Sequence, residues 1–243
     1  MDVNDLRARL PGRDVFHFDS LPTTMHEAGS LVERGYGPGT LVVADEQTAG
    51  QGRYGHTWHS EHAAGVYMSL LLEPDSVLTL ALGLAVSEAI SLLCRLECDL
   101  RWPNDVLIRD KKVAGILVQL HGRLAVAGIG VNVNHRAFPF ELTGIATSLR
   151  LETGRDYARE DLIVEIARSV EAYCRILEDR GRGQILEMFT HCSSYARGKR
   201  VQVEQDGAVL TGTTAGLDDA GFLLVCRDDG SMATVIAGGV RPV

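Results

Sequence analysis

The sequence predicts an α+β protein that ends in a small β-barrel. Two long helical patterns, near residues 76–97 and 159–180, alternate with groups of short apolar runs. The final segment contains only short runs separated by Asp-Gly and Asp-Asp-Ala-Gly turns. We therefore expect a larger domain over residues 1–195 and a small barrel over residues 196–243.

The first half of the chain predicts two helices separated by strands. The expected elements are a helix at 21–35, strands at 40–45 and 65–72, and an apolar helix at 76–97. The first helix has Thr23 or Thr24 as its N-cap and Gly35 as its stop. Cys94 and Cys98 are spaced one helical turn apart within the second helix.

The second half predicts a strand meander, two helices and the barrel strands. Polar turns interrupt the meander at Pro103-Asn104-Asp105, Asp110-Lys111 and His121-Gly122. The helix at 159–180 carries an apolar stripe that we assign to core packing, and a short helix is expected near 183–190. Four terminal strands follow, with the sequences KRVQVEQ, AVLTGTTAGL, GFLLVCR and MATVIAGG.

Composition places the chain among ordinary globular proteins. Hydrophobic residues make up 45% and charged residues 23%. The formal charge of −8, with no helix that gathers Lys and Arg on one face, argues against a nucleic-acid partner. The N-terminus lacks the pattern of a secretory signal, and no apolar run is long enough to span a membrane. We expect a cytoplasmic protein that binds no membrane.

The five cysteines are an odd number at spacings that fit neither a disulfide framework nor a zinc knuckle. They are Cys94, Cys98, Cys174, Cys192 and Cys226. We expect all five to be reduced and structural, because nothing in the sequence supplies a base or a cationic setting for a catalytic thiol.

The glycine-rich stretch EQTAGQGRYGHTW, residues 46–58, follows an apolar run and leaves three interpretations open. A flexible turn needs only the positive φ that glycine supplies. A dinucleotide loop has the spacing of Gly50, Gly52 and Gly55, but the following helix and acidic ribose partner are missing.

A metal site is the third interpretation of this region. His56, His59 and His62 recur at intervals of three residues, with Glu61 among them. No helix is expected here to fix two histidines on one face, as the helical zinc-protease motif requires. We therefore assign no metal to these histidines from the sequence.

A second polar stretch, RWPNDVLIRDKKVAGIL at residues 101–117, decides the interpretation. Taken alone, Lys112 beside Lys111 is a solvated charge cluster on a turn. Together with GQGRYGHTW, the later AGIGVNVN and the terminal strands, however, this stretch resembles the biotin protein ligases in order and spacing over nearly the whole chain.

The resemblance includes three departures from the family pattern. The family loop reads Gly-Arg-Gly-Arg-x-Gly, and Gln51 replaces its first arginine while Arg53 and Trp58 are retained. Arg101 replaces the lysine of the Lys-Trp-Pro-Asn-Asp segment and preserves its charge. Met25 stands where the family has asparagine and cannot hydrogen-bond like an amide.

The resemblance implies a mixed-sheet catalytic domain with an SH3-like C-terminal barrel, and a two-step reaction. The family joins the carboxylate of biotin to the α-phosphate of ATP, then passes the biotinyl group to a lysine of a biotin carboxyl carrier domain. Lys112 and Arg53 match the family's catalytic cations, which suits a step that brings two anions together. Only a short segment precedes the domain here, so we expect no repressor activity.

The resemblance also implies the substrate-binding residues. For biotin they are Thr23, Thr24, Gln47, Gly50, Gln51, Gly115, Leu117, Gly128 and Ile129. For the nucleotide they are Arg53, Trp58, Asn104, Asp105, Lys112 and Asn132. Trp58 either stacks on adenine or serves as a core aromatic residue. Mg²⁺ is expected with ATP, held mainly by phosphates and water, and Asp105 is the one acid suggested near it.

The sequence leaves two rival functions open, and the resemblance also implies a partner and a homodimer. A lipoate or octanoate transferase shares the catalytic fold, but generally lacks the full glycine loop and the terminal barrel. A non-catalytic biotin-responsive protein is suggested only by Gln51. The resemblance implies a carrier domain of acetyl-CoA carboxylase or a related carboxylase as the partner, and a homodimer formed through the catalytic sheets.

Overall fold

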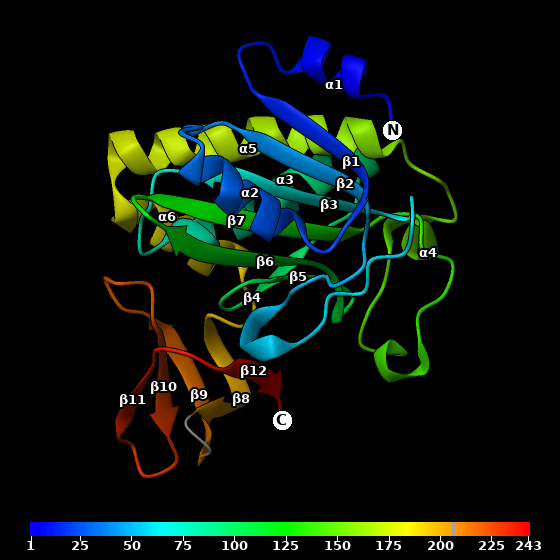
Figure 1. Ribbon diagram of the computed structural model, residues 1–243. Helices are drawn as coiled ribbons and strands as arrows, with labels where there is room; N and C mark the ends of the chain where they lie inside the picture. The colour runs from blue at the N-terminus through cyan, green and yellow to red at the C-terminus, as the bar shows by residue number, and fades with distance from the viewer. Residues whose placement is uncertain (206–207) are drawn as a thin grey trace.

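The computed structural model describes residues 1–205 and 208–243, which form two sheets with helices around the larger one (Figure 1). The helices are α1 Val3–Arg9, α2 Thr24–Glu33, α3 Leu78–Cys94, α4 Leu149–Thr153, α5 Arg159–Arg180 and α6 Arg182–Cys192, with 3-10 turns at Arg53–Gly55 and Phe140–Leu142. The strands of the larger sheet are β1 Val15–Leu21, β2 Leu41–Gln47, β3 Gly65–Leu72, β4 Asp99–Arg101, β5 Asp105–Ile108, β6 Lys111–His121 and β7 Leu124–Asn132. Those of the smaller sheet are β8 Arg197–Gln205, β9 Ala208–Leu217, β10 Leu223–Arg227, β11 Met232–Val235 and β12 Gly239–Pro242.

The larger sheet is mixed, which confirms the predicted α+β class. Its strand order is β1-β2-β3-β7-β6-β5-β4. β1 pairs with β2 in parallel, and the remaining neighbours are antiparallel. The central strands β3 and β7 are covered on both faces, so they are nearly continuous apolar runs without alternation.

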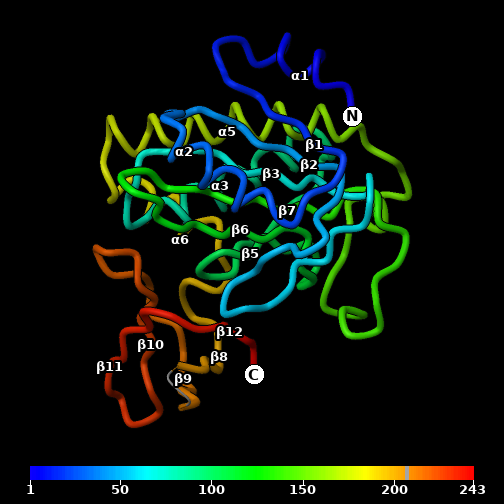
Figure 2. The backbone as a smooth tube through the Cα atoms, in the orientation of Figure 1, coloured from blue at the N-terminus to red at the C-terminus, as the bar shows by residue number. Residues whose placement is uncertain are grey.

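Helices cover both faces of this sheet (Figures 1 and 2). α3 and α5 pack against each other on one face, where they form the larger hydrophobic core. α2 packs on β2, β3 and β7 at the other face, where Met25, Ala28 and Leu31 belong to a smaller core. The smaller core leaves room on the α2 face, and this is where the candidate site lies.

Helix α2 begins and ends where the sequence predicts. Thr23 is its N-cap, and the Thr23 hydroxyl accepts a hydrogen bond from the Met25 amide at 3.3 Å. Gly35 follows the last turn with a φ of +88°, a backbone conformation that residues other than glycine rarely adopt. The N-cap therefore fixes the position of Thr23 and Thr24 beside the end of β2.

Some elements differ from the expectation. α3 ends at Cys94 because Arg95 adopts a left-handed conformation, so Cys98 lies beyond the helix and the predicted one-turn spacing within it is wrong. The C-terminal region has five strands instead of four, because residues 239–242 pair with β8. α1, β1 and α4 lie outside the predicted elements. All five cysteines are free thiols.

The smaller sheet is antiparallel, with the order β11-β10-β9-β8-β12. It is anchored to the meander by Trp102, which is 3% exposed and donates its indole N–H to the Gly221 carbonyl at 2.9 Å. β8 begins at Arg197, and the domain boundary after residue 195 stays a prediction. The expected Asp206-Gly207 turn lies outside the described residues.

Within the described parts of the chain, no helix is both long and apolar enough to cross a membrane.

Candidate functional site

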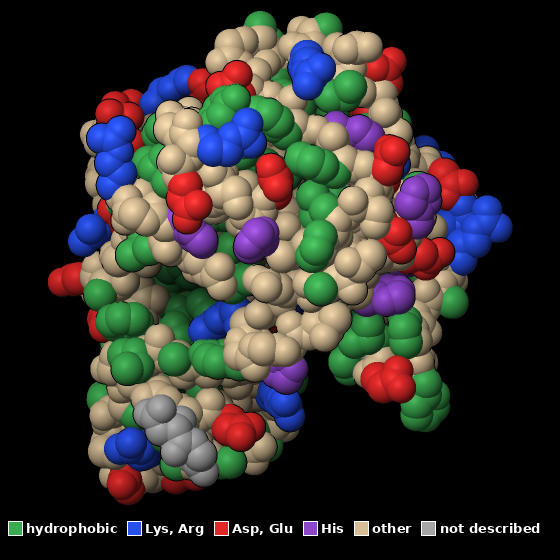
Figure 3. Space-filling model, viewed as in Figure 1, with side chains coloured by type: hydrophobic (Ala, Val, Ile, Leu, Met, Phe, Trp, Pro, Cys, Tyr) green, Lys and Arg blue, Asp and Glu red, His purple; other side chains and the backbone are tan. Residues whose placement is uncertain are grey.

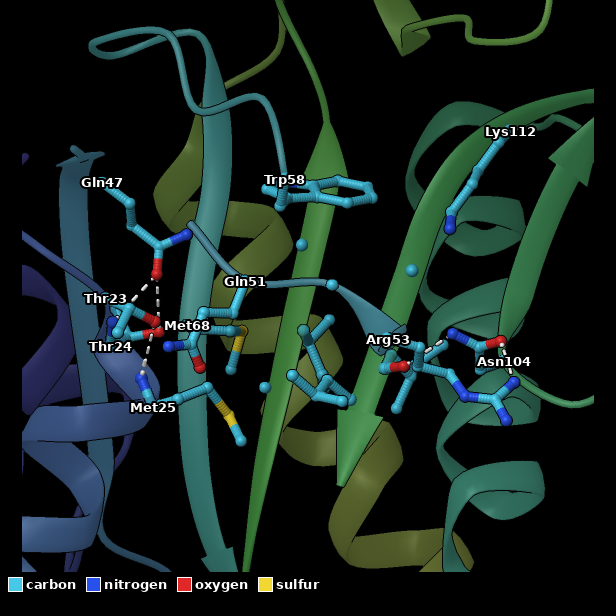
Figure 4. Close-up of a pocket in the computed structure, with 17 residues that line it drawn as sticks. Thr23, Thr24, Met25, Gln47, Gln51, Arg53, Trp58, Met68, Asn104 and Lys112 are labelled. Atoms are coloured by element: carbon cyan, nitrogen blue, oxygen red, sulfur yellow. Dashed lines mark hydrogen bonds between the residues drawn. The ribbon is translucent and has the colours of Figure 1, made fainter. Parts of the chain in front are cut away.

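A cavity opens between α2, the glycine-rich segment and the strands β6 and β7 (Figure 4). The space between its walls, counted together with the part that opens to solvent, is about 450 Å³. The residues that line it are Thr23, Thr24, Met25, Gln47, Gln51, Gly52, Arg53, Trp58, Met68, Asn104, Lys112, Gly115, Ile116, Leu117, Gly128, Ile129 and Gly130.

The floor of the cavity is made of glycines on neighbouring strands. Gly115 of β6 pairs directly with Gly130 of β7, and Gly128 lies two residues away on the same face. A Cβ at Gly130 would lie 2.5 Å from Trp58 Cε2, and one at Gly115 would lie 2.9 Å from Trp58 Cζ3. The indole of Trp58 therefore rests directly on backbone, which only glycine permits.

One end of the cavity is a neutral polar network around Gln47 at the end of β2 (Figure 4). Its amide oxygen accepts from the Thr24 amide at 2.9 Å and from the Thr24 hydroxyl at 3.2 Å. Its amide nitrogen donates to the Ser60 hydroxyl at 3.1 Å. The Thr24 oxygen in turn accepts from Ser69 at 2.8 Å. These bonds fix the directions of uncharged donors and acceptors.

The opposite end of the cavity carries cations (Figure 4). Lys112 Nζ lies 2.5 Å from one carboxylate oxygen of Asp105, and Arg101 Nη2 lies 2.7 Å from the other. Burial favours the protonated form of Asp105, but Lys112 and Arg101 together hold the pKa of this carboxyl below its usual value. Lys112 Nζ also lies 5.4 Å from the ring centroid of Trp58.

The glycine-rich segment folds as a small hairpin. Gln51 and Thr57 form an isolated antiparallel bridge, and the Gly52 amide donates to the His56 carbonyl at 2.7 Å. At the tip, Tyr54 and Gly55 have positive φ values of 55° and 75°. The hairpin turns Arg53 toward the cationic end of the cavity.

Arg53 and Tyr54 connect this hairpin to two other parts of the fold. Arg53 Nη1 donates to the Asn104 side-chain oxygen at 3.2 Å, and Arg53 Nη2 donates to the Tyr54 hydroxyl at 2.7 Å. The same hydroxyl accepts from the amide of Gly238, which immediately precedes β12 of the C-terminal sheet, at 2.6 Å. The hairpin tip is thus held by the smaller sheet.

A recess separates the larger body from the C-terminal sheet (Figure 3). It is lined from both sides, by residues such as Arg53 and Ile116 of the larger body and Gly221 and Ile236 of the smaller sheet. Because Arg53 and Ile116 also line the first cavity, the two hollows meet at the cationic end.

The residues predicted for biotin gather in the cavity, with one exception. Gly50 does not line it, but a Cβ there would lie 2.6 Å from the Trp58 carbonyl oxygen. Ile129 lines the cavity although its side chain belongs to the larger core, which leaves its backbone facing the cavity. Met25 is buried but lies on the cavity side of the floor, since its sulfur is 2.5 Å from where a Cβ at Gly128 would be.

The residues predicted for the nucleotide lie at the cationic end. Arg53, Trp58, Asn104 and Lys112 line the cavity, whereas Asp105 and Asn132 do not. Asp105 instead contacts Lys112, and the Asn132 amide donates to the Lys112 carbonyl at 3.5 Å. Asp105 and Asn132 therefore contact Lys112, which lines the cavity, and do not line it themselves.

Five lining residues lie outside the predicted set: Met25, Gly52, Met68, Ile116 and Gly130. Strand alternation could have found Gly130, because it shares a face with the predicted Gly128. Alternation along β3 carries no such signal, since all eight of its residues are buried. The sequence assigned no metal to His56, His59 and His62. In the structure His59 lies with Glu61 and His135, whereas His56 and His62 belong to neither of the ligand groups found among the described side chains.

Comparison with protein families gives two matches along the chain. Residues 15–134 match the Biotin/lipoate A/B protein ligase family, and residues 197–240 match the Biotin protein ligase C terminal domain. The first match contains the whole cavity lining, and the second contains most of the smaller sheet.

Individual proteins show the same relationship. The chain is 35% identical over 240 residues to the bifunctional ligase/repressor BirA of Bacillus subtilis, covering 93% of this chain and 73% of that protein. It is 34% identical over 213 residues to a biotin–[acetyl-CoA-carboxylase] ligase of Mycobacterium tuberculosis, covering 83% and 77%. The biotin protein ligase of Aquifex aeolicus in complex with biotin and ATP superposes with a TM-score of 0.85 at 30% identity, covering 95% of this chain and 99% of that one. The chain therefore belongs to the biotin protein ligase family.

Proposed function

We propose that this protein uses ATP to attach biotin to a lysine of a biotin carboxyl carrier domain. In the first step a carboxylate oxygen of biotin attacks the α-phosphorus of ATP, an acyl–phosphate bond forms and pyrophosphate leaves. In the second step the acceptor amine attacks the acyl carbon, loses its proton and displaces AMP. Family membership and the Aquifex complex with biotin and ATP support this activity.

The observation that carries the proposal is the division of the cavity into a neutral polar end and a cationic end. Biotin has a ureido ring at one end and a carboxylate at the other, joined by an apolar chain. Thr24 and Gln47 supply donors and acceptors suited to the ureido group. The glycine floor and Leu117 suit the apolar part, and Lys112 lies where the carboxylate would arrive.

We assign the catalytic role to Lys112. A carboxylate and a phosphate repel each other, so a cation between them lowers the barrier by stabilising the charge that gathers as they join. In the structure Lys112 is held by Asp105, which also binds Arg101. Asp105 is therefore a positioning residue, and it stays paired with Arg101 when Lys112 moves to the substrate.

Arg53 is assigned to the α-phosphate, and Asn104, Trp58 and Asn132 to the rest of the nucleotide. The planar guanidinium of Arg53 binds phosphate oxygens in pairs, and its bond to the Asn104 side chain orients it toward the cavity. Trp58 offers the face of its ring, with Lys112 on the same side of the cavity. Water is excluded from the reactive anhydride when the hairpin covers it.

A magnesium ion carried by ATP would neutralise charge on the triphosphate. The two groups of potential metal ligands found among the described side chains contain no residue that lines the cavity. Asp105, the acid suggested from the sequence, has both oxygens occupied by cations. The residues present thus fit an ion held by phosphates and water rather than by a protein cage.

The remaining assignments concern the setting of the reaction. We propose a carrier domain of acetyl-CoA carboxylase or a related carboxylase as the acceptor, cytoplasmic location, a homodimer and no nucleic-acid partner. The net charge of −8 supports the last of these, because phosphate backbones bind cationic surfaces. Sedimentation of the purified chain would test the homodimer.

The test of the proposed function is exchange of labelled pyrophosphate into ATP with biotin, lipoate or octanoate as the acid. Exchange that depends on biotin alone is the expected result. Exchange with lipoate or octanoate instead would move the chain to the transferases that share this fold, and no exchange would favour a non-catalytic binding protein.

A pair of neighbouring lysines provides a matched control. Lys112→Ala should abolish exchange, whereas Lys111→Ala should not, because Lys111 is exposed and does not line the cavity. Normal exchange by a folded Lys112→Ala variant would contradict the role assigned to this residue.

A further inference from the structure

Two imidazoles and a carboxylate meet next to the pocket wall, in a cluster that the ligase reaction does not use. His59 and Glu61 follow Trp58 on the way to β3, and His135 lies just beyond the end of β7. One potential ligand atom from each of the three lies within 4.8 Å of the others. Ligand atoms of a tetrahedral zinc site lie about 3.3–3.6 Å apart, given bond lengths of about 2.0–2.2 Å, so a small inward movement would close this group around an ion.

The hydrogen bonds of His135 leave one ring nitrogen free. Its Nε2 lies 3.3 Å from the Tyr67 hydroxyl, which donates its own proton to the Glu61 carbonyl at 2.8 Å. The hydroxyl oxygen can therefore only accept from His135, which puts the ring proton on Nε2 and a lone pair on Nδ1. His135 is 0% exposed, and its Nδ1 has no hydrogen-bond partner within residues 1–205 and 208–243.

A buried imidazole nitrogen without a partner requires a physical explanation. The tautomer is the one found in metal-binding histidines, in which the second ring nitrogen donates to a fixed acceptor and orients the ring. Phe138 stacks on His135 with ring centroids 5.2 Å apart and an interplanar angle of 18°, and the His59 ring lies 5.8 Å away. The ring is thus oriented before any ion arrives.

The second group of potential ligands in the described chain, His17, Asp19 and Asp45, provides a contrast. Asp45 already receives Arg159 at 2.7 Å and His17 at 2.9 Å, and the terminal amine of Met1 lies at 3.5 Å. Protein cations occupy this carboxylate, so a metal ion there would be repelled. In the His59 cluster, by comparison, Glu61 is exposed and no ion pair of this residue occurs among the described side chains.

We propose that His59, Glu61 and His135 bind a divalent cation of the zinc class. Two imidazole nitrogens and one carboxylate suit this class, and they disfavour Mg²⁺, which requires oxygen ligands. The ion fixes the segment after Trp58 against the end of β7. Ser60 lies within this segment and accepts from the pocket residue Gln47 at 3.1 Å, so the ion also steadies the polar end of the cavity.

The experiment is a Zn²⁺ titration of tag-free, chelator-treated protein by calorimetry, with Co²⁺ absorption as a second probe of the ligands. Wild type should bind one Zn²⁺, and His59→Asn and Glu61→Gln should each weaken it by about tenfold or more. Both residues are at least partly exposed, so these variants should fold. His62→Asn is the matched control, since His62 is an exposed histidine of the same segment outside the cluster.

Cys192→Ser serves as a second control, because Cys192 is an exposed thiol that could bind zinc by itself. Retention of binding by this variant and by His62→Asn supports the proposal. Equal affinity in wild type and His59→Asn, loss of binding in Cys192→Ser, or binding of Mg²⁺ as tight as that of Zn²⁺ would each overturn it. Neither biotin nor ATP is present, so the outcome is independent of the ligase reaction.

Discussion

Replacement of Gly130 by alanine tests whether the glycine floor exists to hold the ring of Trp58. An added Cβ would lie 2.5, 2.6 and 2.8 Å from three atoms of the indole. Ordinary contacts of a Cβ are 3.4–4 Å, so the ring must move away by roughly 1 Å or leave the floor. An indole is rigid and cannot yield by rotating its end, as a long flexible side chain could.

The cost to stability should be modest. Overpacking in a closed core costs about 1–3 kcal/mol, and Trp58 is half-buried on a hairpin, so the ring can swing outward without compressing the sheet. We expect a loss near the lower limit, about 1 kcal/mol, which corresponds to a decrease in Tm of about 2–4 °C for a chain of this size. The larger effect should be on nucleotide binding, seen as an increased KM for ATP in pyrophosphate exchange.

Tryptophan fluorescence reports the movement directly. The chain has two tryptophans, and Trp102 is 3% exposed, so a red shift in Gly130→Ala would come from Trp58. Gly128→Ala is the control on the same strand, because there the added Cβ meets the flexible side chain of Met25 at 2.5 Å instead of an indole. Unchanged emission, stability and KM for ATP in Gly130→Ala would refute the assignment of the floor to Trp58.

Three other predictions concern the helix core, the hairpin and the buried carboxylate. Gly83→Ala should raise the free energy of unfolding, measured by urea denaturation, by about 0.5–1 kcal/mol. Gly83 lies inside α3, and a Cβ there would meet its nearest neighbours at ordinary distances of 3.7 and 3.9 Å. A lower free energy of unfolding would show that the site is overpacked. Tyr54→Phe removes the hydroxyl that joins the hairpin to Gly238, so amide hydrogen exchange in the hairpin should become faster. The free energy of unfolding should fall by about 0.5–1.5 kcal/mol at most. Unchanged hydrogen exchange would contradict the link between the hairpin and Gly238. The folded-state pKa of Asp105 is lowered, so its stabilising effect is complete above the unfolded value near 3.8 and is lost as the pH falls through the folded value. The difference in stability between wild type and Asp105→Asn should therefore narrow below pH 3.8, and a constant difference in acid denaturation would contradict the charge assignment.

The fold could be predicted where local chemistry alone decides it. The N-cap at Thr23 and the helix stop at Gly35 could be predicted, because each depends only on side chains and backbone conformations within one helical turn. The end of α3 at Cys94 could not be predicted, because the apolar pattern continues past Cys94 and only the left-handed conformation of Arg95 interrupts the helix. β1 could not be predicted from local sequence, because its residues form a strand through parallel pairing with β2.

The site could be predicted in part, because the resemblance supplied residues but not their contacts. The motifs identify Lys112 and Arg53, whereas the bond of Tyr54 to Gly238 joins residues 184 positions apart. His135 illustrates the same limit. Nothing in the sequence near it indicates a ligand, and only the packing of β7 brings it beside His59 and Glu61.

The two cations on Asp105, Lys112 and Arg101, suggest how the proposed catalytic lysine could move without a loss of stability. Removing both cations from a largely buried carboxylate costs much free energy, because the charge is left unpaired. Removing only one of the two cations costs much less. In the proposed reaction the biotin carboxylate and the nucleotide phosphate would attract Lys112, while Asp105 would keep Arg101, which lies 2.7 Å away in the structure. In that reaction Lys112 would exchange one anionic partner, Asp105, for another, the substrate. Arg101, which replaces the lysine of the family motif, can bind Asp105 through two of its nitrogens, at 3.2 and 2.7 Å, and so holds the carboxylate in place after the lysine has moved.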